Sequence, residues 1–383
     1  MIRTDLNVPM HEGTVTDDTR IHASLPTLNY LREQQARCIV CSHAGRPKGE
    51  VREELRLDPV RDRLSELLGV EVKKTGDCIG DEVNKAVEQL LPGEVLLLEN
   101  TRFHPEEKKN DPDFARKLSE HGEIFVNDAF ASAHRAHAST EGVAHYLPSY
   151  AGLLMMKELE VLSSLLQNPD HPSIAIMGGA KAADKIGVIS RLLPDIDMLL
   201  VGGVPATTLM KAKGMEIGVS IVDNDALDDA RSLIEKAGNK LVMPIDVLVT
   251  TDISVYGEAE MHQVTDVPLS TSIIDIGAET SAMYKKKLEK AGTVVWNGPL
   301  GIAEIEQFAQ GTLKIMNKLS EIDATVVVGG GDTVAVIQKA GKKDAFTHVS
   351  TGGDAFLEFL EGKELPGIAV LQGEFAEAAY GQV

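Results

Sequence analysis

The chain has 383 residues, of which 43% are hydrophobic and 25% are charged, and its 58 acidic and 38 basic residues give a formal net charge of −20. This composition is typical of a globular protein, and the length predicts two domains. The acidic balance argues against a nucleic-acid partner, because binding a phosphate backbone requires a basic face.

The sequence also argues against a membrane protein and against a protein stabilised by disulfides. No apolar run is long enough to span a bilayer, and the N-terminus lacks the basic-then-apolar layout of a secretion signal, so we expect a cytoplasmic protein with no membrane partner. Three cysteines are too few for a disulfide framework. Cys38 and Cys41 lie three apart on an apparent strand and should point to opposite faces, as buried small side chains rather than a redox or metal pair.

Continuous apolar runs alternate with helix-like segments along the whole chain. The runs are "RCIVCSH", "EVLLLEN", "EIFVNDAF", "SIAIMGG", "MLLVGG", "LVMPIDVLV", "TVVWNGP" and "ATVVVGGG". Runs without alternation are typical of strands buried on both faces of a parallel sheet. Segments between them, such as 58–68 and 226–236, have apolar residues three and four apart. The pattern predicts repeated βα units.

In the first part of the chain, arginine recurs at the ends of the predicted strands. Twelve of the fourteen arginines lie within residues 1–150. The polar residues at or just beyond strand ends are Arg3, Asp5, Asn7, Arg20, His43, Arg46, Arg102, Arg135 and His137. Because the carboxyl ends of parallel strands share one sheet edge, these side chains can converge on a small anion, which arginine binds bidentately. Taken singly, each arginine could instead be a solvated surface charge.

The segment "AGLLMMKELEVLSSLLQNPDHPS" predicts one long helix that ends at Asn168-Pro169. We interpret it as an interdomain helix, although a crossover helix within one large sheet is the alternative. The predicted divisions are an N-terminal domain over 1–152, the helix over 153–169, a C-terminal domain over 170–356, and a segment over 357–383 that returns towards the N-terminal domain.

Glycine-rich turns characterise the second domain. In "SIAIMGGAKAADKIGVI", a Gly-Gly turn leads into a predicted helix with Lys181 and Lys185 on one face near its N-terminus, where backbone N–H groups favour phosphate. Surface lysines are the alternative, and the P-loop motif is absent. In "VVVGGGDT", Asp332 could hold Mg²⁺ and Thr333 could donate to phosphate; "HVSTGGDAF" is a third such turn. Together they predict a site for a nucleotide triphosphate and a metal, and no dinucleotide fingerprint is present.

Eight ordered motifs resemble the phosphoglycerate kinase family over essentially the whole chain. They are "DLNVP", "SHAGRPKG", "LLENTRFHPEE", "FVNDAFASAHRAH", "GGAKAADKI", "VVWNGPLGIAEIEQFAQGT", "GGGDT" and "HVSTGG" followed by "LEFLEGKELPG". The resemblance implies two Rossmann-like three-layer α/β/α domains with mainly parallel sheets, separated by a cleft and joined by a long helix. It also implies a monomer whose N-terminal domain binds 3-phosphoglycerate or 1,3-bisphosphoglycerate, whose C-terminal domain binds Mg-ADP or Mg-ATP, and whose domains close for phosphoryl transfer.

The same resemblance implies a role for each motif residue. Phosphoglycerate would be bound by Asp5, Asn7, Arg20, His43, Arg46, Arg102 and Arg135, with Arg3 and His137 behind them. The nucleotide would be bound by Gly179, Lys181, Lys185, Gly203, Asn297, Pro299, Glu304 (at the ribose), Gly330, Gly331, Asp332 and Thr333, with Asp332 as the ligand of Mg²⁺. The catalytic residues would be Arg20 and Lys181, which stabilise charge. No general base is needed, since the attacking carboxylate is already ionised at neutral pH.

The sequence departs from the family pattern at several places. The first strand begins at Met1-Ile2-Arg3, shorter than the family has before this arginine. Val204-Pro205, Ala278 and Ala303 are unusual residues near the expected adenine pocket, and Asp354 stands where a third glycine is expected. A carboxylate beside a phosphate repels it unless the carboxylate faces away or binds the metal. We therefore expect an active enzyme with an altered nucleotide preference or affinity.

Three other functions compete with this interpretation. The first is a non-catalytic relative that binds nucleotide or phosphoglycerate without turnover, which intact Arg20, Lys181 and Asp332 argue against. The second is a kinase that phosphorylates another carboxylate, which the arginine-rich first domain disfavours because it suits a substrate that also carries a phosphate. The third is a two-lobed solute-binding protein, which the missing signal sequence disfavours.

Overall fold

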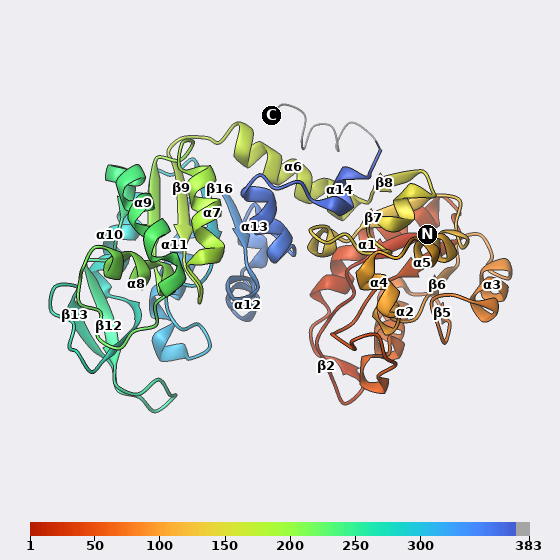
Figure 1. Ribbon diagram of the computed structural model, residues 1–383, viewed down its shortest axis with the longest axis horizontal. Coiled ribbons are helices and arrows are strands. Elements are labelled where there is room, and N and C mark those ends of the chain that lie inside the picture. Colours follow the sequence, from red (N-terminus) through yellow and green to blue (C-terminus); the bar gives the residue numbers. More distant parts are fainter. Residues whose placement is uncertain (373–383) are drawn as a thin grey trace. The chain divides into compact units, whose positions relative to one another are not determined.

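The computed structural model describes residues 1–372, and the chain divides into two compact units (Figure 1). Of the described residues, the first unit contains Met1–Ser163 and 364–372, and the second contains Ser164–Lys363. The boundary falls inside helix α6 (Leu153–Gln167). Within residues 1–372, no helix is long and apolar enough to cross a membrane.

The first unit is built on a six-stranded sheet in which every neighbouring pair is parallel. Its order is β5 (Val72–Lys74), β6 (Val95–Leu97), β4 (Cys38–Cys41), β1 (Ile2–Thr4), β7 (Phe125–Asp128) and β8 (Ser149–Ala151), and a small hairpin is formed by β2 (Met10–His11) and β3 (Thr14–Val15). Its helices are α1 (Thr19–Glu33), α2 (Asp58–Leu68), α3 (Asp81–Glu88), α4 (Pro105–Lys109), α5 (Pro112–Ser119) and α14 (Pro366–Ala369). Short 3₁₀ helices are η1 (Glu53–Leu55), η2 (Thr101–Phe103), η3 (Phe130–Ser132) and η4 (Gly142–His145).

Strand β4 shows how the apolar runs build two cores. Cys38 and Val40 pack into one buried cluster, whereas Ile39 and Cys41 pack into another. Successive side chains of a strand point to opposite faces, so a strand covered on both faces must be apolar throughout. The predicted orientation of the two cysteines is confirmed, and all three cysteines of the chain are buried and unpaired.

The segment after Lys363 packs against strands of the first unit. The Gly367 amide donates to the Ala133 carbonyl (2.9 Å), the Asn127 side-chain amide donates to the Gly367 carbonyl (2.9 Å), and the Gln372 amide donates to Ser149 (2.7 Å). Helix α13 (Asp354–Leu360), which overlaps the start of the predicted C-terminal segment 357–383, belongs to the second unit. Residues 373–383 of the predicted segment lie outside the described residues.

The second unit has its own parallel sheet of six strands and a smaller antiparallel sheet. The parallel order is β11 (Leu241–Val242), β10 (Met198–Val201), β9 (Ser173–Met177), β15 (Thr293–Asn297), β16 (Thr325–Gly329) and β17 (His348–Val349); the small sheet contains β13 (Glu260–Gln263), β12 (Asp246–Thr250) and β14 (Ser272–Ile276). The helices are α7 (Ala183–Leu192), α8 (Gly203–Ala212), α9 (Leu227–Ala237), α10 (Ala278–Leu288), α11 (Gln310–Leu319), α12 (Gly331–Lys339) and α13, with η5 (Asn224–Ala226), η6 (Gly238–Lys240), η7 (Glu306–Phe308) and η8 (Lys343–Ala345).

One sequence expectation was wrong in this unit. The run "LVMPIDVLV" is not a single strand of the parallel sheet, since only Leu241–Val242 joins that sheet as β11. Pro244 interrupts the run, and the residues after it form β12, which pairs antiparallel with both of its neighbours. Proline has no N–H to donate, so it ends a strand that apolar composition alone would continue.

Candidate functional site

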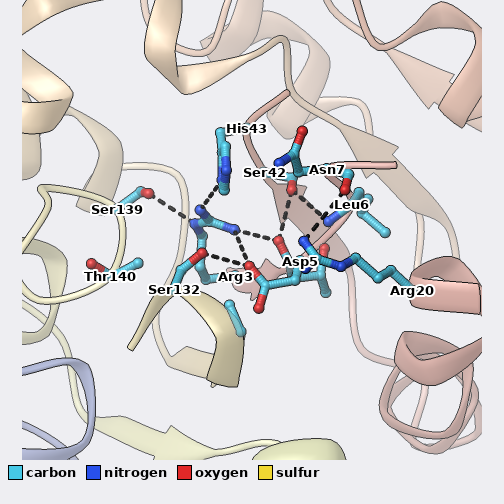
Figure 2. A network of polar contacts seen from close by, with 12 residues as sticks. Arg3, Asp5, Leu6, Asn7, Arg20, Ser42, His43, Ser132, Ser139 and Thr140 are labelled. Atoms are coloured by element: carbon cyan, nitrogen blue, oxygen red, sulfur yellow. Dashed lines mark hydrogen bonds and ion pairs between the residues drawn. The ribbon is translucent and has the colours of Figure 1, made fainter. Parts of the chain in front are cut away.

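In the first unit, Arg3 is the buried centre of a polar network at the carboxyl edge of the sheet (Figure 2). Its Nε donates to Ser139 Oγ (2.9 Å), and its Nη2 lies 2.8 Å from His43 Nδ1. Its Nη1 donates to the Thr4 carbonyl oxygen and lies 3.9 Å from Asp5 Oδ1. A buried guanidinium needs this many acceptors, because each N–H left unpaired would cost free energy. Arg3 thereby joins the ends of β1 and β4.

Hydrogen bonds hold the loop after β4 against the end of β1 and the segment that follows it. Ser42 Oγ donates to the Thr4 carbonyl (2.7 Å) and accepts from the Leu6 amide (2.9 Å), while the Gly45 amide donates to Asn7 Oδ1 (2.9 Å). Gly45 has φ +60°, where any other residue would be strained, and a Cβ there would also force the Leu55 side chain, 2.6 Å away, to shift. The turn therefore presents Arg46, which is exposed, from a rigid backbone.

Arg102 and Asn100 connect this loop to the end of β6. Asn100 Oδ1 accepts from the Ala44 amide (3.2 Å) and the Arg102 amide (3.1 Å), and Arg102 Nη1 donates to the Gly45 carbonyl (2.9 Å). Burial, then the nearby charges of Arg3 and Arg135, lower the pKa of Arg102 to about 10. Like charges gathered at one edge favour the arrival of an anion.

Two histidines lie inside the same cluster of cations. Burial, then Arg3, Arg102 and Arg20, hold the pKa of His43 well below its usual range. Burial, then Arg102 and Arg3, lower the pKa of His137 to about 3. Both rings are therefore neutral near pH 7 and can accept or donate hydrogen bonds without adding charge.

The remaining predicted residues of the first unit lie at the same edge. Arg20, in the first turn of α1, is partly exposed and donates to the Asn7 carbonyl (3.3 Å). Arg135 is partly exposed, and its Nε donates to His134 Nε2 (2.8 Å). Asp5 is buried and accepts from Ser132 Oγ (2.5 Å). Ser132, Ser139 and Asn100 were missed from the sequence, because a buried hydroxyl or amide carries no signal until its partner is known.

In the second unit, the turns after β9 and β15 pack backbone against backbone. A Cβ on Gly178 would lie 2.1 Å from the Pro299 carbonyl oxygen, and one on Gly298 would lie 2.2 Å from the Gly178 oxygen. The Gly179 amide donates to the Pro299 carbonyl (2.8 Å). This close approach requires glycine, and it brings the predicted residues Gly179, Asn297 and Pro299 together.

Lys185 reaches from the first turn of α7 to the end of β15, where its Nζ donates to Asn297 Oδ1. Burial lowers the pKa of Lys185, while Asp184, Asp332 and Asp354 raise it, so these carboxylates lie close enough to act on it. Lys181 is exposed, 3.9 Å from Asp184, and precedes α7 rather than lying on it. The expected shared helical face is therefore wrong.

Gly330, Gly331, Asp332 and Thr333 form the start of α12, directly after β16. Thr333 is buried, and its hydroxyl accepts from the Gly298 amide (2.9 Å), so it supports the neighbouring turn. Asp332 is exposed in the first turn of the helix. Asp354 is also in a first turn, that of α13. Its charge raises the pKa of Lys185, after the larger effects of burial, Asp184 and Asp332.

A cavity of about 360 Å³ opens beside these turns. Five predicted residues line it, namely Gly179, Gly203, Pro299, Glu304 and Asp332; Val204, which departs from the family pattern, also lines it. The rest of the lining includes Thr207, Met210, Ile221, Val247, Ile253, Ile274, Asp275, Leu300 and Ile302. An apolar pocket of this size with polar groups at one side suits a flat base and its ribose.

Comparison with known proteins gives the family. A sequence model of phosphoglycerate kinase matches residues 1–363. The chain belongs to the phosphoglycerate kinase family. Curated phosphoglycerate kinases of Moorella thermoacetica and Pelotomaculum thermopropionicum are each 51% identical to it over 374 residues, which is 97% of this chain and 95% of each relative.

Solved structures agree. A phosphoglycerate kinase from Coxiella burnetii superposes with a TM-score of 0.85 at 43% identity, covering 96% of this chain and 94% of that one. A phosphoglycerate kinase from Pyrococcus horikoshii OT3 superposes with a TM-score of 0.87 at 34% identity, covering 100% of this chain and 96% of that one. The predicted family, the α/β fold with two Rossmann-like units, and the enzyme class of phosphoglycerate kinase are thereby confirmed.

Proposed function

We propose that this chain catalyses the reversible, Mg²⁺-dependent transfer of a phosphoryl group between 1,3-bisphosphoglycerate and ADP, which yields 3-phosphoglycerate and ATP in glycolysis and gluconeogenesis. The observation that carries the proposal is the convergence of Arg3, Arg20, Arg102 and Arg135 on the neutral rings of His43 and His137. So many cations at one sheet edge repel one another unless a multivalent anion joins them. Membership of the phosphoglycerate kinase family supplies the identity of that anion.

Phosphoglycerate is assigned to the first unit. Arg20, Arg46, Arg102 and Arg135 would bind its phosphate and carboxylate, since guanidinium groups match both in bidentate geometry. Within residues 1–372, Nε of Arg102 and Oδ2 of Asp5 are buried without a hydrogen-bond partner. A ligand with both acceptor oxygens and a hydroxyl would satisfy both atoms, which supports Asp5 as the residue that accepts from the substrate hydroxyl.

The nucleotide is assigned to the second unit. Its base would fill the 360 Å³ cavity, with Glu304 at the ribose and the turns at Gly179 and Gly203 beside it. Its phosphates would lie along Lys185, Asn297 and the start of α12. Asn297 Nδ2 is buried and has no hydrogen-bond partner in the described part of the chain, so it is available to a phosphate oxygen.

The donor set also fits Mg²⁺. This ion prefers oxygen ligands and is usually held by one or two carboxylates together with substrate phosphates. Asp332 offers an exposed carboxylate at the edge of the cavity, and Asp354 is a second carboxylate that acts on Lys185. When bound, the ion neutralises negative charge on the phosphate oxygens.

Phosphoryl transfer requires in-line placement and positive charge, not a protein nucleophile. The carboxylate of 3-phosphoglycerate is ionised at neutral pH and attacks without a base. In this mechanism Arg20 and Lys181 stabilise charge on the moving group, and closure of the two units brings donor and acceptor together. We also propose that the protein is a cytoplasmic monomer that binds neither nucleic acid nor a membrane.

The test is a coupled assay with 3-phosphoglycerate and Mg-ATP, run with several nucleoside triphosphates. We expect turnover that requires Mg²⁺ and is fastest with 3-phosphoglycerate. Binding of both substrates without turnover would favour the non-catalytic alternative. Faster phosphorylation of acetate or an amino acid would refute the assigned substrate.

A further inference from the structure

Three side chains that could bind a metal ion lie close together in the first unit, beyond the end of β5. A carboxylate oxygen of Asp77, the Sγ of Cys78 and a ring nitrogen of His104 all lie within 4.8 Å of one another. Nε2 of His104 is 2.6 Å from Oδ1 of Asp77. None of the three is used in the phosphoryl-transfer mechanism proposed above.

The loop that carries Asp77 and Cys78 is held in place by hydrogen bonds to its backbone. The Asp77 carbonyl accepts from Thr75 Oγ1 (2.7 Å) and from the Glu99 amide (3.3 Å). The Cys78 amide donates to Asp77 Oδ1 (2.6 Å), and its carbonyl lies 3.1 Å from His121 Nε2. The positions of the carboxylate and the thiol are therefore set by the fold before any ligand arrives, which lowers the entropic cost of binding.

The three donors differ in exposure in a way that suits a cation site. Cys78 is fully buried, whereas the side chain of Asp77 is 48% exposed and that of His104 is 25% exposed. The His104 ring also packs on Phe114, with ring centroids 5.1 Å apart. A cation could enter from solvent past Asp77 and His104 and meet the thiol at the inner end, leaving room outside for a water ligand.

We propose that Asp77, Cys78 and His104 form a binding site for a zinc-class divalent cation. Sulfur, imidazole nitrogen and carboxylate oxygen are the three ligand types that zinc accepts, and three protein ligands plus one water complete its tetrahedral shell. Magnesium does not compete here, because it prefers oxygen ligands alone. Binding converts the Cys78 thiol into a metal-bound thiolate and releases its proton to solvent.

Occupation of this site would have a structural consequence. His104 follows η2, which contains Arg102, so the cation would link the loop after β5 to the segment that presents this arginine. A ligand that binds only the folded state raises its stability in proportion to its concentration over its Kd. The bound cation should therefore raise the melting temperature of the protein.

The experiment uses the full chain, stripped of metal with a chelator and then titrated with Co²⁺. Excess Mg²⁺ is present throughout, because it occupies the sites that offer only oxygen ligands. We expect one equivalent to bind with a sulfur-to-cobalt charge-transfer band and the visible bands of tetrahedral cobalt, and Zn²⁺ to displace it. Cys78→Ser should abolish the charge-transfer band. His104→Gln should weaken binding by at least the roughly 10–100-fold that loss of a supporting partner costs at such sites.

Cys38→Ser is the matched control, since Cys38 is equally buried but packs in a different core. It should bind Co²⁺ as wild type does. Melting curves measured without metal identify any of these variants that fails to fold. Asp77→Asn is then used in place of that variant. The proposal is overturned if no charge-transfer band appears, if Cys78→Ser and His104→Gln bind as wild type does, or if Zn²⁺ leaves the melting temperature unchanged.

Discussion

Nη2 of Arg3 lies 2.8 Å from Nδ1 of His43, and both side chains are buried. A guanidinium offers only donors and stays protonated in proteins, so Nδ1 must accept this hydrogen bond. His43 is therefore neutral, with its proton on Nε2, in agreement with its strongly lowered pKa. Arg3 thus selects the tautomer that leaves Nε2–H as a donor for a bound anion.

The neighbouring His137 makes the stability of the protein depend on pH. Its pKa is about 3 in the folded chain and about 6.5 in the unfolded chain, so the unfolded state binds more protons between these values. Stability is therefore lost as pH falls through this window. We expect His137→Gln to reduce the slope of unfolding free energy against pH, measured by denaturant titrations between pH 6.5 and 5, by up to about 1.4 kcal/mol per pH unit.

The comparison must be made between variants, because other buried groups act in the opposite direction. Burial raises the pKa of Asp128 and of Asp275 to about 7, so each favours the folded state as pH falls. These contributions cancel when His137→Gln is compared with wild type. The exposed His11, changed to Gln, is the control and should leave the slope unchanged. Equal slopes for His137→Gln and wild type would contradict the prediction.

The sheets and turns could be predicted because their physical signals are local. A strand buried on both faces must be apolar throughout, as Ile39 and Cys41 illustrate, and a backbone approach like that at Gly298 admits only glycine. In contrast, the residue at which α7 starts could not be predicted. Its N-cap position is Ala182, which has no side chain that caps a helix, so nothing in the sequence separates Lys181 from the helix.

The cavity in the second unit could not be predicted from the sequence for a different reason. Met210, Ile274 and Ile302 line it from three different segments, and each resembles an ordinary core residue. Apolar composition does not distinguish a core from the wall of a pocket. Glu304 and Asp332 could be assigned because they are polar residues within motifs that indicate a ligand, whereas Ile302, in the same motif as Glu304, has no polar side chain to indicate contact with one.

Arg46 is predicted to act on one substrate alone. It is exposed on the turn held by Gly45 and Asn7 in the first unit, far along the chain from the nucleotide residues. Loss of one hydrogen bond to a charged group costs roughly 1.5–3 kcal/mol. Arg46→Ala should therefore weaken 3-phosphoglycerate binding roughly ten- to hundredfold and leave ATP affinity unchanged, as measured by titration calorimetry.

The control for this prediction is Arg52→Ala, which removes a nearby exposed arginine that pairs with Glu50. Its affinities for both ligands should match wild type. Parallel losses of both affinities in Arg46→Ala would show a general disturbance of the fold and would remove the assigned role.

Lys181 should affect turnover rather than affinity. Its side chain is 73% exposed and lies 3.9 Å from Asp184, so little of the folded structure depends on it. If it stabilises charge on the moving phosphoryl group, Lys181→Ala should lower kcat by roughly 10²–10³, as loss of one such donor does elsewhere. KM values for both substrates should change little. Lys236→Ala, another exposed lysine of this unit, is the control, and normal turnover in Lys181→Ala would remove its catalytic role.

Asp332 is predicted to set the requirement for Mg²⁺. Like Glu304 it is an exposed carboxylate that lines the cavity, and its charge acts on Lys185. Asp332→Asn keeps the size of the side chain but removes its charge, so the Mg²⁺ concentration at half-maximal rate should rise roughly tenfold or more. The measurement is the coupled assay with free Mg²⁺ varied at saturating substrates. Asp344→Asn, which alters an exposed carboxylate of η8, should follow the wild-type curve, and an unshifted curve for Asp332→Asn would exclude it as the metal ligand.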